Sequence, residues 1–202
     1  MFNHNSVLIV IAGANGSGKT SFTTDVLAHE WLTGCAYINP DNIARDVYGD
    51  WNDRDAIIKA ARYAEDERER HLSLRESMAF ESVMSTRDKV DFIKRARANG
   101  YFVRLFFVGT DSPIINGARI TKRMILGGHE VPLSKVLSRY PKSLACSVEV
   151  ASFADRAYFL DNSIENEKPR LLFRTENGAI VRYFADFDAH PWAMKIAESI
   201  TD

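Results

Sequence analysis

Residues 7–20 have the sequence VLIVIAGANGSGKT, in which an apolar run leads into a glycine-rich loop that ends in Lys19 and Thr20. The apolar run is typical of a buried strand, and the residues after the loop favour a helix. A loop of this pattern between a strand and a helix is a phosphate-binding loop, or P-loop. Its backbone N–H groups point into one concavity and the following helix adds its positive end, so the segment predicts a polyphosphate site.

The P-loop pattern assigns a part to its polar residues. Lys19 is expected to reach the β- and γ-phosphates of a nucleotide, and the Thr20 hydroxyl to take one coordination position on Mg²⁺. A chance glycine-rich turn is the alternative, and the full match between a strand and a helix argues against it. The predicted nucleotide-binding residues are Gly13, Ala14, Asn15, Gly16, Ser17, Gly18, Lys19, Thr20 and Ser21. The sequence holds no Asn-Lys-x-Asp motif for guanine, which favours ATP as the nucleotide.

The size and charge of the chain limit its class and its partners. With 202 residues, 46% of them hydrophobic, residues 1–202 are expected to form one domain. The formal net charge of −1, with both signs interspersed, disfavours nucleic acid and anionic membranes as partners. Cys35 and Cys146 are too far apart in sequence to suggest a disulfide framework or a zinc site. We find no secretion signal and no run of about 20 apolar residues, and therefore expect a cytoplasmic protein.

Further along the chain, apolar runs alternate with helical patterns, which is typical of an α/β protein with a mainly parallel sheet. We therefore predict a P-loop NTPase or kinase fold with three layers and a mainly parallel central sheet. The predicted core strands are residues 6–12, 35–39, 77–81, 101–108 and 156–160. Helix signals lie between them, including a cap at Asn52 or Asp53 for residues 54–75, and prolines 113, 132 and 191 in first helical turns. Residues 170–175 and 179–184 flank Asn177-Gly178, which predicts an added C-terminal hairpin.

Two groups of polar residues are interpreted as surface features. The charge run at residues 65–70 lies in a predicted helix with a weak apolar stripe, so a solvated helix face is favoured over a binding site for a partner. His4, His29 and His71 have no partner at metal-ligand spacing, and we expect each at the surface without a role.

Asp41 is the leading candidate for a residue that activates a nucleophile. It follows the second predicted strand, and ligands gather at the carboxyl ends of strands in open α/β sheets. A carboxylate there is able to accept the proton of an attacking hydroxyl group. The alternative is that Asp41 only caps the next helix, because Pro40 disfavours helical backbone at Asn39.

Several segments together resemble the zeta toxin family. They are residues 12–20, 39–44 (NPDNIA), 80–82 (FES), 119–132 (RITKRMILGGHEVP), 139–144 (RYPKSL) and 154–163 (ADRAYFLDNS). The resemblance covers the chain from about residue 6 to about residue 163. It implies an ATP-dependent kinase that phosphorylates a sugar hydroxyl of UDP-N-acetylglucosamine, with Mg²⁺ and, in many relatives, an antitoxin partner.

The resemblance also implies roles for individual residues. Asp41 would be the base, Lys19 and Thr20 would hold phosphate and Mg²⁺, and Glu81 would help to hold the acceptor together with Asp41 and Ser82. Arg123 and Arg139 would clamp the transferring phosphate, and Arg119 would contact the nucleotide. Fixed guanidinium groups suit this task because charge spreads over the equatorial oxygens during phosphoryl transfer.

These arginines belong to a predicted helical lid at about residues 113–150. Gly127-Gly128 is expected to end a helix and act as a hinge, and His129 to fix the loop by hydrogen bonding rather than take part in chemistry. Residues 82–87 (SVMSTR) differ from the long toxins, which place a glycine and a threonine there for the substrate. A smaller hydroxylated acceptor or a different nucleotide therefore remains open.

Two other functions remain as alternatives to a small-molecule kinase. One is a P-loop NTPase that acts as a partner-coupled switch without a small-molecule acceptor. The other is a nucleotide-binding partner of an antitoxin with little catalysis, against which the intact set of Lys19, Thr20, Asp41 and Arg123 argues.

Overall fold

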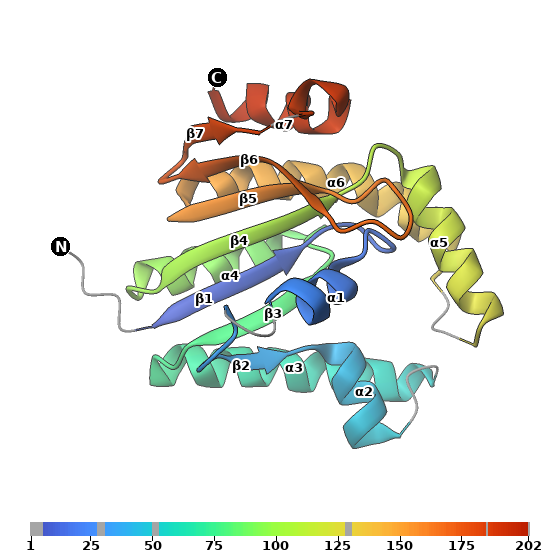
Figure 1. Cartoon of the computed structure of the whole chain (residues 1–202). Helices are drawn as coiled ribbons and strands as arrows, with labels where there is room; N and C mark the ends of the chain where they lie inside the picture. Colours follow the sequence, from blue (N-terminus) through green and yellow to red (C-terminus); the bar gives the residue numbers. More distant parts are fainter. Residues whose placement is uncertain (1–5, 28–30, 50–52, 128–130, 185, 202) are drawn as a thin grey trace.

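A single seven-stranded sheet forms the centre of the molecule (Figure 1). The structure is a computed structural model that describes residues 6–27, 31–49, 53–127, 131–184 and 186–201. The strands are β1 (Val7–Ala12), β2 (Ala36–Ile38), β3 (Met78–Ser82), β4 (Phe102–Gly109), β5 (Arg156–Asp161), β6 (Arg170–Glu176) and β7 (Ala179–Tyr183). Their order in the sheet is β2-β3-β1-β4-β5-β6-β7.

The first five strands are parallel and the last two are antiparallel additions. Strand β1 lies at the centre of the parallel part, paired with β3 on one side and β4 on the other. Strands β6 and β7 form a hairpin whose turn is Asn177-Gly178, both in the left-handed conformation that such a turn requires. The predicted mainly parallel sheet and the C-terminal hairpin are both confirmed, with strand bounds within about two residues.

The helices connect the parallel strands. They are α1 (Lys19–Phe22) with a π-helical turn at Thr23–Leu27, α2 (Pro40–Tyr48), α3 (Arg54–Leu74), α4 (Arg87–Ala98), α5 (Pro113–Ile125), α6 (Leu133–Phe153), a 3₁₀ turn at Phe187–Ala189 and α7 (Pro191–Thr201). Side chains of Asp53 and Ser112 cap α3 and α5 by accepting backbone N–H bonds, as the sequence predicts. Pro132 is the residue before α6 rather than within its first turn, and Pro141 lies inside that helix.

Alternate strand residues point to opposite faces of the sheet, and each face is covered. Leu8 and Val10 pack into the larger core, with apolar residues of α4, α6 and α7. Ile9 and Ile11 pack on the other face against Phe22 of α1. Figure 1 shows α4 and α6 behind the sheet and α1 in front of it, which is the predicted three-layer arrangement.

The interpretation of the charge run as a solvated face is wrong for Arg68, which is only 5% exposed and faces the sheet. His71 is also buried, not at the surface: its Nδ1 lies 2.8 Å from a carboxylate oxygen of Glu76. Both errors have the same cause. Helix α3 runs across the edge of the sheet, so residues that look polar and external in the sequence lie beneath neighbouring elements. His4, His29 and Asn52 lie outside the described residues.

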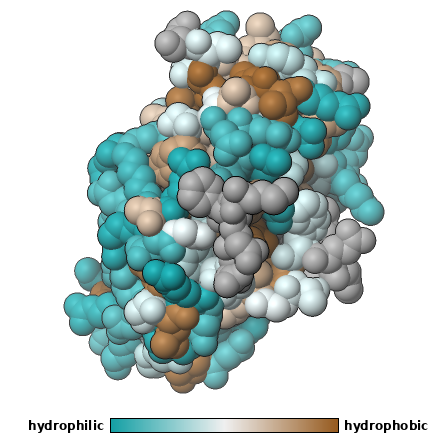
Figure 2. Space-filling model, turned by 90° about the vertical axis from the view of Figure 1, so that its left-hand side faces the viewer, coloured by the Kyte–Doolittle hydropathy of each residue, from teal (hydrophilic) through white to brown (hydrophobic). Residues whose placement is uncertain are grey.

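The face at the amino ends of the parallel strands is mainly hydrophilic (Figure 2). Apolar side chains on this face gather near the top, the end of the molecule where Figure 1 shows β7 and α7. Val181 and Tyr183 of the edge strand β7 are about half exposed. None of the helices in the described part of the chain is long and apolar enough to span a bilayer.

Candidate active site

The glycine-rich loop turns sharply between β1 and α1 and forms the floor of the site. Gly16 and Gly18 have φ values of 79° and 94°, and any side chain at Gly13 would lie 2.2 Å from the Val108 carbonyl oxygen. Lys19 Nζ donates to the carbonyl oxygens of Gly13 and Ala14, at 2.8 and 3.0 Å. Burial lowers the pKa of Lys19 to about 8, against the opposing pull of Glu81 and Asp41.

Asn162 supports this loop from the end of β5. Its Nδ2 donates to the Ser17 carbonyl oxygen at 2.8 Å, and its backbone N–H donates to Gly109 O at 2.9 Å. A side chain at Gly18 would lie 2.2 Å from Asn162 Nδ2. The close approach of the loop to Asn162 therefore explains why the position holds glycine. The sequence gave no sign of this role, because the two segments are 145 residues apart.

Three hydroxyl groups hold the Glu81 carboxylate beside the loop. Thr20 Oγ1 donates to Oε2 at 2.9 Å, Thr23 Oγ1 donates to Oε1 at 2.9 Å, and the Tyr37 hydroxyl donates to Oε1. Burial and the neighbouring Glu81 carboxylate raise the pKa of Tyr37, which therefore stays protonated as a donor. The Thr20 hydroxyl and the Glu81 carboxylate are hard oxygen ligands side by side, and this pair fits Mg²⁺.

Asp41 lies in the first turn of α2 but does not cap it. The cap is Asn39, whose Oδ1 accepts the Asp41 backbone N–H at 2.9 Å. The capping alternative for Asp41 is therefore wrong. Within the described part of the chain, no hydrogen bond or ion pair engages the Asp41 carboxylate, which lines the same cavity as Lys19.

The three candidate arginines differ in how they are held. Arg119 donates to the carbonyl oxygens of Asn162 and Ser163 at 2.7 and 3.3 Å, so its position depends on the end of β5. Arg139 donates to Asn15 Oδ1 at 3.3 Å across the loop. The Arg123 guanidinium has no partner among the described residues.

One open cavity of about 890 Å³ at the carboxyl ends of the strands brings most of the predicted residues together. Those that line it are Asn15, Gly16, Gly18, Lys19, Thr20, Ser21, Asp41, Glu81, Ser82, Arg119, Arg123 and Arg139. Gly13, Ala14 and Ser17 lie beneath its floor rather than in its lining. His129 and Gly128 lie outside the described residues, while Gly127 follows α5 with a φ of 83°.

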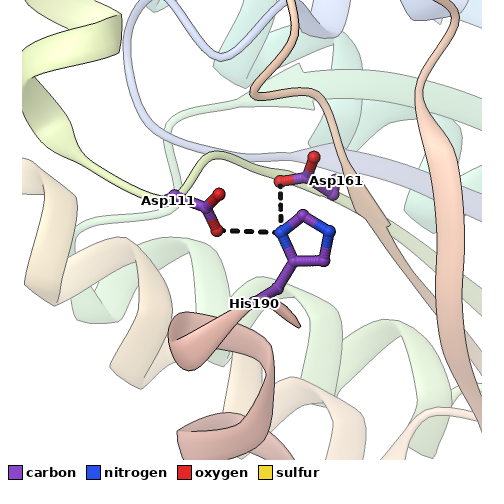
Figure 3. Close-up of side chains that lie close together, drawn as sticks. All are labelled: Asp111, Asp161 and His190. Carbon is purple, nitrogen blue, oxygen red and sulfur yellow. Dashed lines mark hydrogen bonds and ion pairs between the residues drawn. The ribbon is translucent and has the colours of Figure 1, made fainter. Parts of the chain in front are cut away.

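A cluster of Asp111, Asp161 and His190 lies behind the loop (Figure 3). Nδ1 of His190, just before α7, lies 2.9 Å from Asp111 Oδ1 and 3.4 Å from Asp161 Oδ1. The two carboxylates come from the segment after β4 and from the end of β5. Asp161 also accepts from the backbone N–H and the hydroxyl group of Ser163. The cluster thus connects α7 to the strand ends that support the P-loop, and sequence reasoning missed it.

The fold and the cavity define the class of the protein as a P-loop phosphotransferase. A lysine and a threonine follow a strand within a glycine-rich loop, and a carboxylate and several arginines face them. The description "Zeta toxin" belongs to the family whose model matches residues 3–143. The chain therefore belongs to the zeta toxin family.

Individual relatives are similar over different parts of the chain. An uncharacterized protein of Haemophilus influenzae is 33% identical over 137 residues, which are 65% of this chain and 91% of that protein. The crystal structure of AvrRxo1-ORF1:-ORF2 with ATP superposes with a TM-score of 0.70 at 15% identity, over 96% of this chain. This chain spans only 64% of that one. A structure from the PezAT chromosomal toxin–antitoxin system of Streptococcus pneumoniae gives a TM-score of 0.61 at 12% identity, over 98% of this chain and 88% of that one.

Proposed function

We propose that this protein is a kinase that transfers the γ-phosphate of ATP to a hydroxyl group of a nucleotide sugar such as UDP-N-acetylglucosamine. The single observation that carries the proposal is the free Asp41 carboxylate, which faces the P-loop lysine within one cavity. A carboxylate without a structural partner at this place suits a general base. A switch that only hydrolyses nucleotide would need no acceptor, yet the cavity extends well beyond the P-loop along α3 and the start of α4.

In the proposed reaction, each residue acts on a different part of the transfer. Asp41 accepts the proton as the acceptor oxygen forms its bond to the γ-phosphorus, and the bond to the β,γ-bridging oxygen breaks to release ADP. Lys19 and the loop N–H groups hold the β- and γ-phosphates in line for this displacement. Arg123 and Arg139 stabilise charge on the transferring group, since guanidinium groups keep their charge.

The Mg²⁺ that such a reaction requires fits the oxygen pair described above. Thr20 would coordinate the ion, and Glu81 would hold it directly or through a water molecule; the ion would neutralise charge on the phosphates. Because Glu81 is held by three hydroxyl groups, we assign it to the metal side of the cavity as well as to the acceptor.

We also propose that α5 and α6 form a lid over the nucleotide, and that the protein has an antitoxin partner. Both helices contribute arginines to the cavity, which supports the first proposal. The second is supported by similarity in fold to proteins from an ORF1:ORF2 complex and from a toxin–antitoxin system.

The test is mass spectrometry of the protein incubated with Mg-ATP and a panel of hydroxylated acceptors led by UDP-N-acetylglucosamine. We expect one acceptor to gain a single phosphate. Asp41→Asn should lower the rate of transfer by about 10²- to 10⁴-fold, the range typical of a lost general base. Asp46→Asn is the matched control, because Asp46 lies on the same helix but pairs with the exposed Arg45 at 2.7 Å.

Two outcomes would count against the proposal. Transfer at the wild-type rate by Asp41→Asn would remove Asp41 as the base. ADP release without any phosphorylated acceptor would favour an NTPase.

A further inference from the structure

The cavity is far more basic than the chain that forms it. The whole protein has 26 basic and 27 acidic residues, but Asp41 and Glu81 are the only acidic residues among those that line the cavity in the described part of the chain. The basic residues that line it are Lys19, Arg54, Arg68, Lys89, Arg119, Arg123, Lys135 and Arg139. A triphosphate partly neutralised by a metal ion does not need all of this charge.

The basic residues come from two separate parts of the fold. Lys19, Arg119, Arg123, Lys135 and Arg139 belong to α1, α5 and α6, around the nucleotide loop. The other three belong to α3 and α4, next to the β3 side of the cavity. Figure 1 shows α3 and α5 at different sides of the strand ends. The cavity therefore has a second positive region, which we call the α3–α4 end and define by Arg54, Arg68 and Lys89.

Arg68 is the unusual member of this region. It is 5% exposed, and its guanidinium group lies over the rings of Phe80 and Phe92, 5.3 and 5.9 Å from their centroids. It lines the cavity, yet within the described ranges of the chain no hydrogen bond or ion pair engages its side chain. Burial lowers the pKa of Arg68, which reflects the cost of a charge without a close counter-ion.

The nearest carboxylates do not supply that counter-ion. Glu65, Glu69 and Asp88 act on Arg68 only at longer range. Glu69 is held by Arg95, with 3.0 Å between Arg95 Nη1 and Oε2, and Asp88 lies 2.7 Å from Lys89 Nζ. The buried guanidinium is thus left to a ligand in the cavity. An anion there would recover part of the free energy lost on burial of the charge.

The start of α4 adds a second feature that suits an anion. Ser85, Thr86 and Lys89 line the same end of the cavity. Thr86 is at the N-cap of α4 but makes no capping hydrogen bond through its side chain, so backbone N–H groups of the first turn are available. Asp88 in that turn opposes an anion, although its charge is offset by Lys89.

The segment that leads into α4 is fixed in a strained form. Met84 has a φ of 49° although it is bulky and its side chain is buried. Its backbone N–H donates to Ser82 Oγ at 2.9 Å, and the preceding Val83 carbonyl oxygen accepts from Ser143 Oγ at 2.6 Å. These bonds hold the start of α4 against the cavity.

We propose that the α3–α4 end is a phosphate-binding subsite for the acceptor, in which Arg68 and the first turn of α4 bind a phosphate or diphosphate group. The proposal rests on the kinase function proposed above and narrows its substrate class. The acceptor carries a phosphate group as well as the hydroxyl that reaches Asp41, and simple unphosphorylated sugars are excluded. Arg54 and Lys89 add charge at the edge of the subsite.

The test measures binding without catalysis. The nucleotide loop is first saturated with Mg²⁺ and a non-hydrolysable ATP analogue, and inorganic pyrophosphate is then titrated by calorimetry. We expect wild-type protein to bind pyrophosphate and Arg68→Met to bind it at least tenfold more weakly. The methionine keeps apolar contact with Phe80 and Phe92, and urea unfolding should show a stability equal to or above that of the wild type.

Arg45→Gln is the matched control, because it removes an exposed arginine that does not line the cavity, and it should bind pyrophosphate as the wild type does. Should Arg68→Met fail to fold, Lys89→Gln provides the second variant, with an expected loss of about threefold. Absence of pyrophosphate binding in the wild type, or equal binding in Arg68→Met, would overturn the subsite.

A kinetic arm separates the subsite from the kinase proposal. With an accepted substrate, Arg68→Met should raise KM at least tenfold and change kcat little, because the contact is the same in the ground state and the transition state. If pyrophosphate binds through Arg68 but no acceptor is phosphorylated, the kinase proposal fails and the subsite stands. If transfer occurs with unchanged KM in Arg68→Met, the subsite fails and the kinase proposal stands.

Discussion

Lys19 is the residue whose environment has the clearest consequence for pH dependence. Its pKa is lowered from 10.5 to about 8 by burial in the loop. The unfolded chain therefore holds more protons than the folded chain between pH 8 and 10.5, so the contribution of Lys19 to the free energy of unfolding rises with pH in that window. Bound phosphates would act in the opposite sense, because their charge favours the protonated ammonium and raises the pKa.

The first prediction follows for nucleotide affinity. The affinity for a Mg-bound ATP analogue should fall as the pH rises above about 8, approaching tenfold per pH unit, because binding then requires uptake of a proton. Calorimetric titration between pH 7.5 and 9.5 measures this slope. Lys19→Arg should bind with a much flatter profile, since a guanidinium group stays charged throughout. A flat profile in the wild type would contradict the assigned position of Lys19.

Other residues of the site differ in how far the sequence reveals them. Lys19, Thr20 and Asp41 were predictable because a local motif or a strand end defines their place. Asn162, Tyr37 and Arg68 were not, since their roles arise from contacts between segments far apart in sequence. Arg68 is the clearest case: it lies in a charge run whose pattern indicates solvent, and only the packing of α3 on Phe80 and Phe92 buries it.

At the scale of elements, the P-loop and the end of β5 behave as one unit. Asn162 holds the Ser17 carbonyl oxygen, and Arg119 in α5 is held by the carbonyl oxygens of Asn162 and Ser163. A disturbance at the contact of Asn162 with the loop should therefore reach the nucleotide site from two directions.

Gly18→Ala tests this unit. The added methyl group would lie 2.2 Å from Asn162 Nδ2, at a φ of 94°, and should weaken binding of the ATP analogue at least tenfold. Gly49→Ala is the control: its φ is 79° but nothing lies within 4 Å of the added carbon. Both variants should lose about 1 kcal/mol of stability from left-handed backbone, and only Gly18→Ala should lose affinity. Equal affinities in a binding titration would show that Asn162 does not constrain the loop.

The elements themselves were largely predictable from the sequence. Apolar runs fixed the five parallel strands, and Asn177-Gly178 fixed the hairpin, because each signal is local. The π-helical turn after α1 and the proline inside α6 were not anticipated. Local propensity does not favour either feature, and the surrounding packing determines both.

At the scale of the whole molecule, the Asp111, Asp161 and His190 cluster joins the last helix to the core of the sheet. The family match ends at residue 143, so His190 and α7 lie beyond it. Trp192 on the same helix fills the space at Gly109, where an added side chain would lie 2.4 Å from the ring. The C-terminal part thus packs directly behind the strand ends that carry the site.

His190→Ala should lower the free energy of unfolding by about 2 kcal/mol, because it leaves two neighbouring carboxylates without their shared donor. Urea denaturation measures the change. Lys195→Gln, at an exposed position of α7, is the control and should stay within about 0.5 kcal/mol of the wild type. Wild-type stability in His190→Ala would mean that the cluster does not contribute to holding α7.

The measurement that tests the central claim most directly is the ratio of phosphate transferred to ADP released. The protein is incubated with Mg²⁺, γ-labelled ATP and the acceptor panel, and label in the acceptor, label in free phosphate and ADP are counted together. The account predicts one labelled acceptor for each ADP, with release of ADP dependent on the acceptor. ADP matched instead by free phosphate, whichever acceptor is present, would contradict the assignment as a small-molecule kinase.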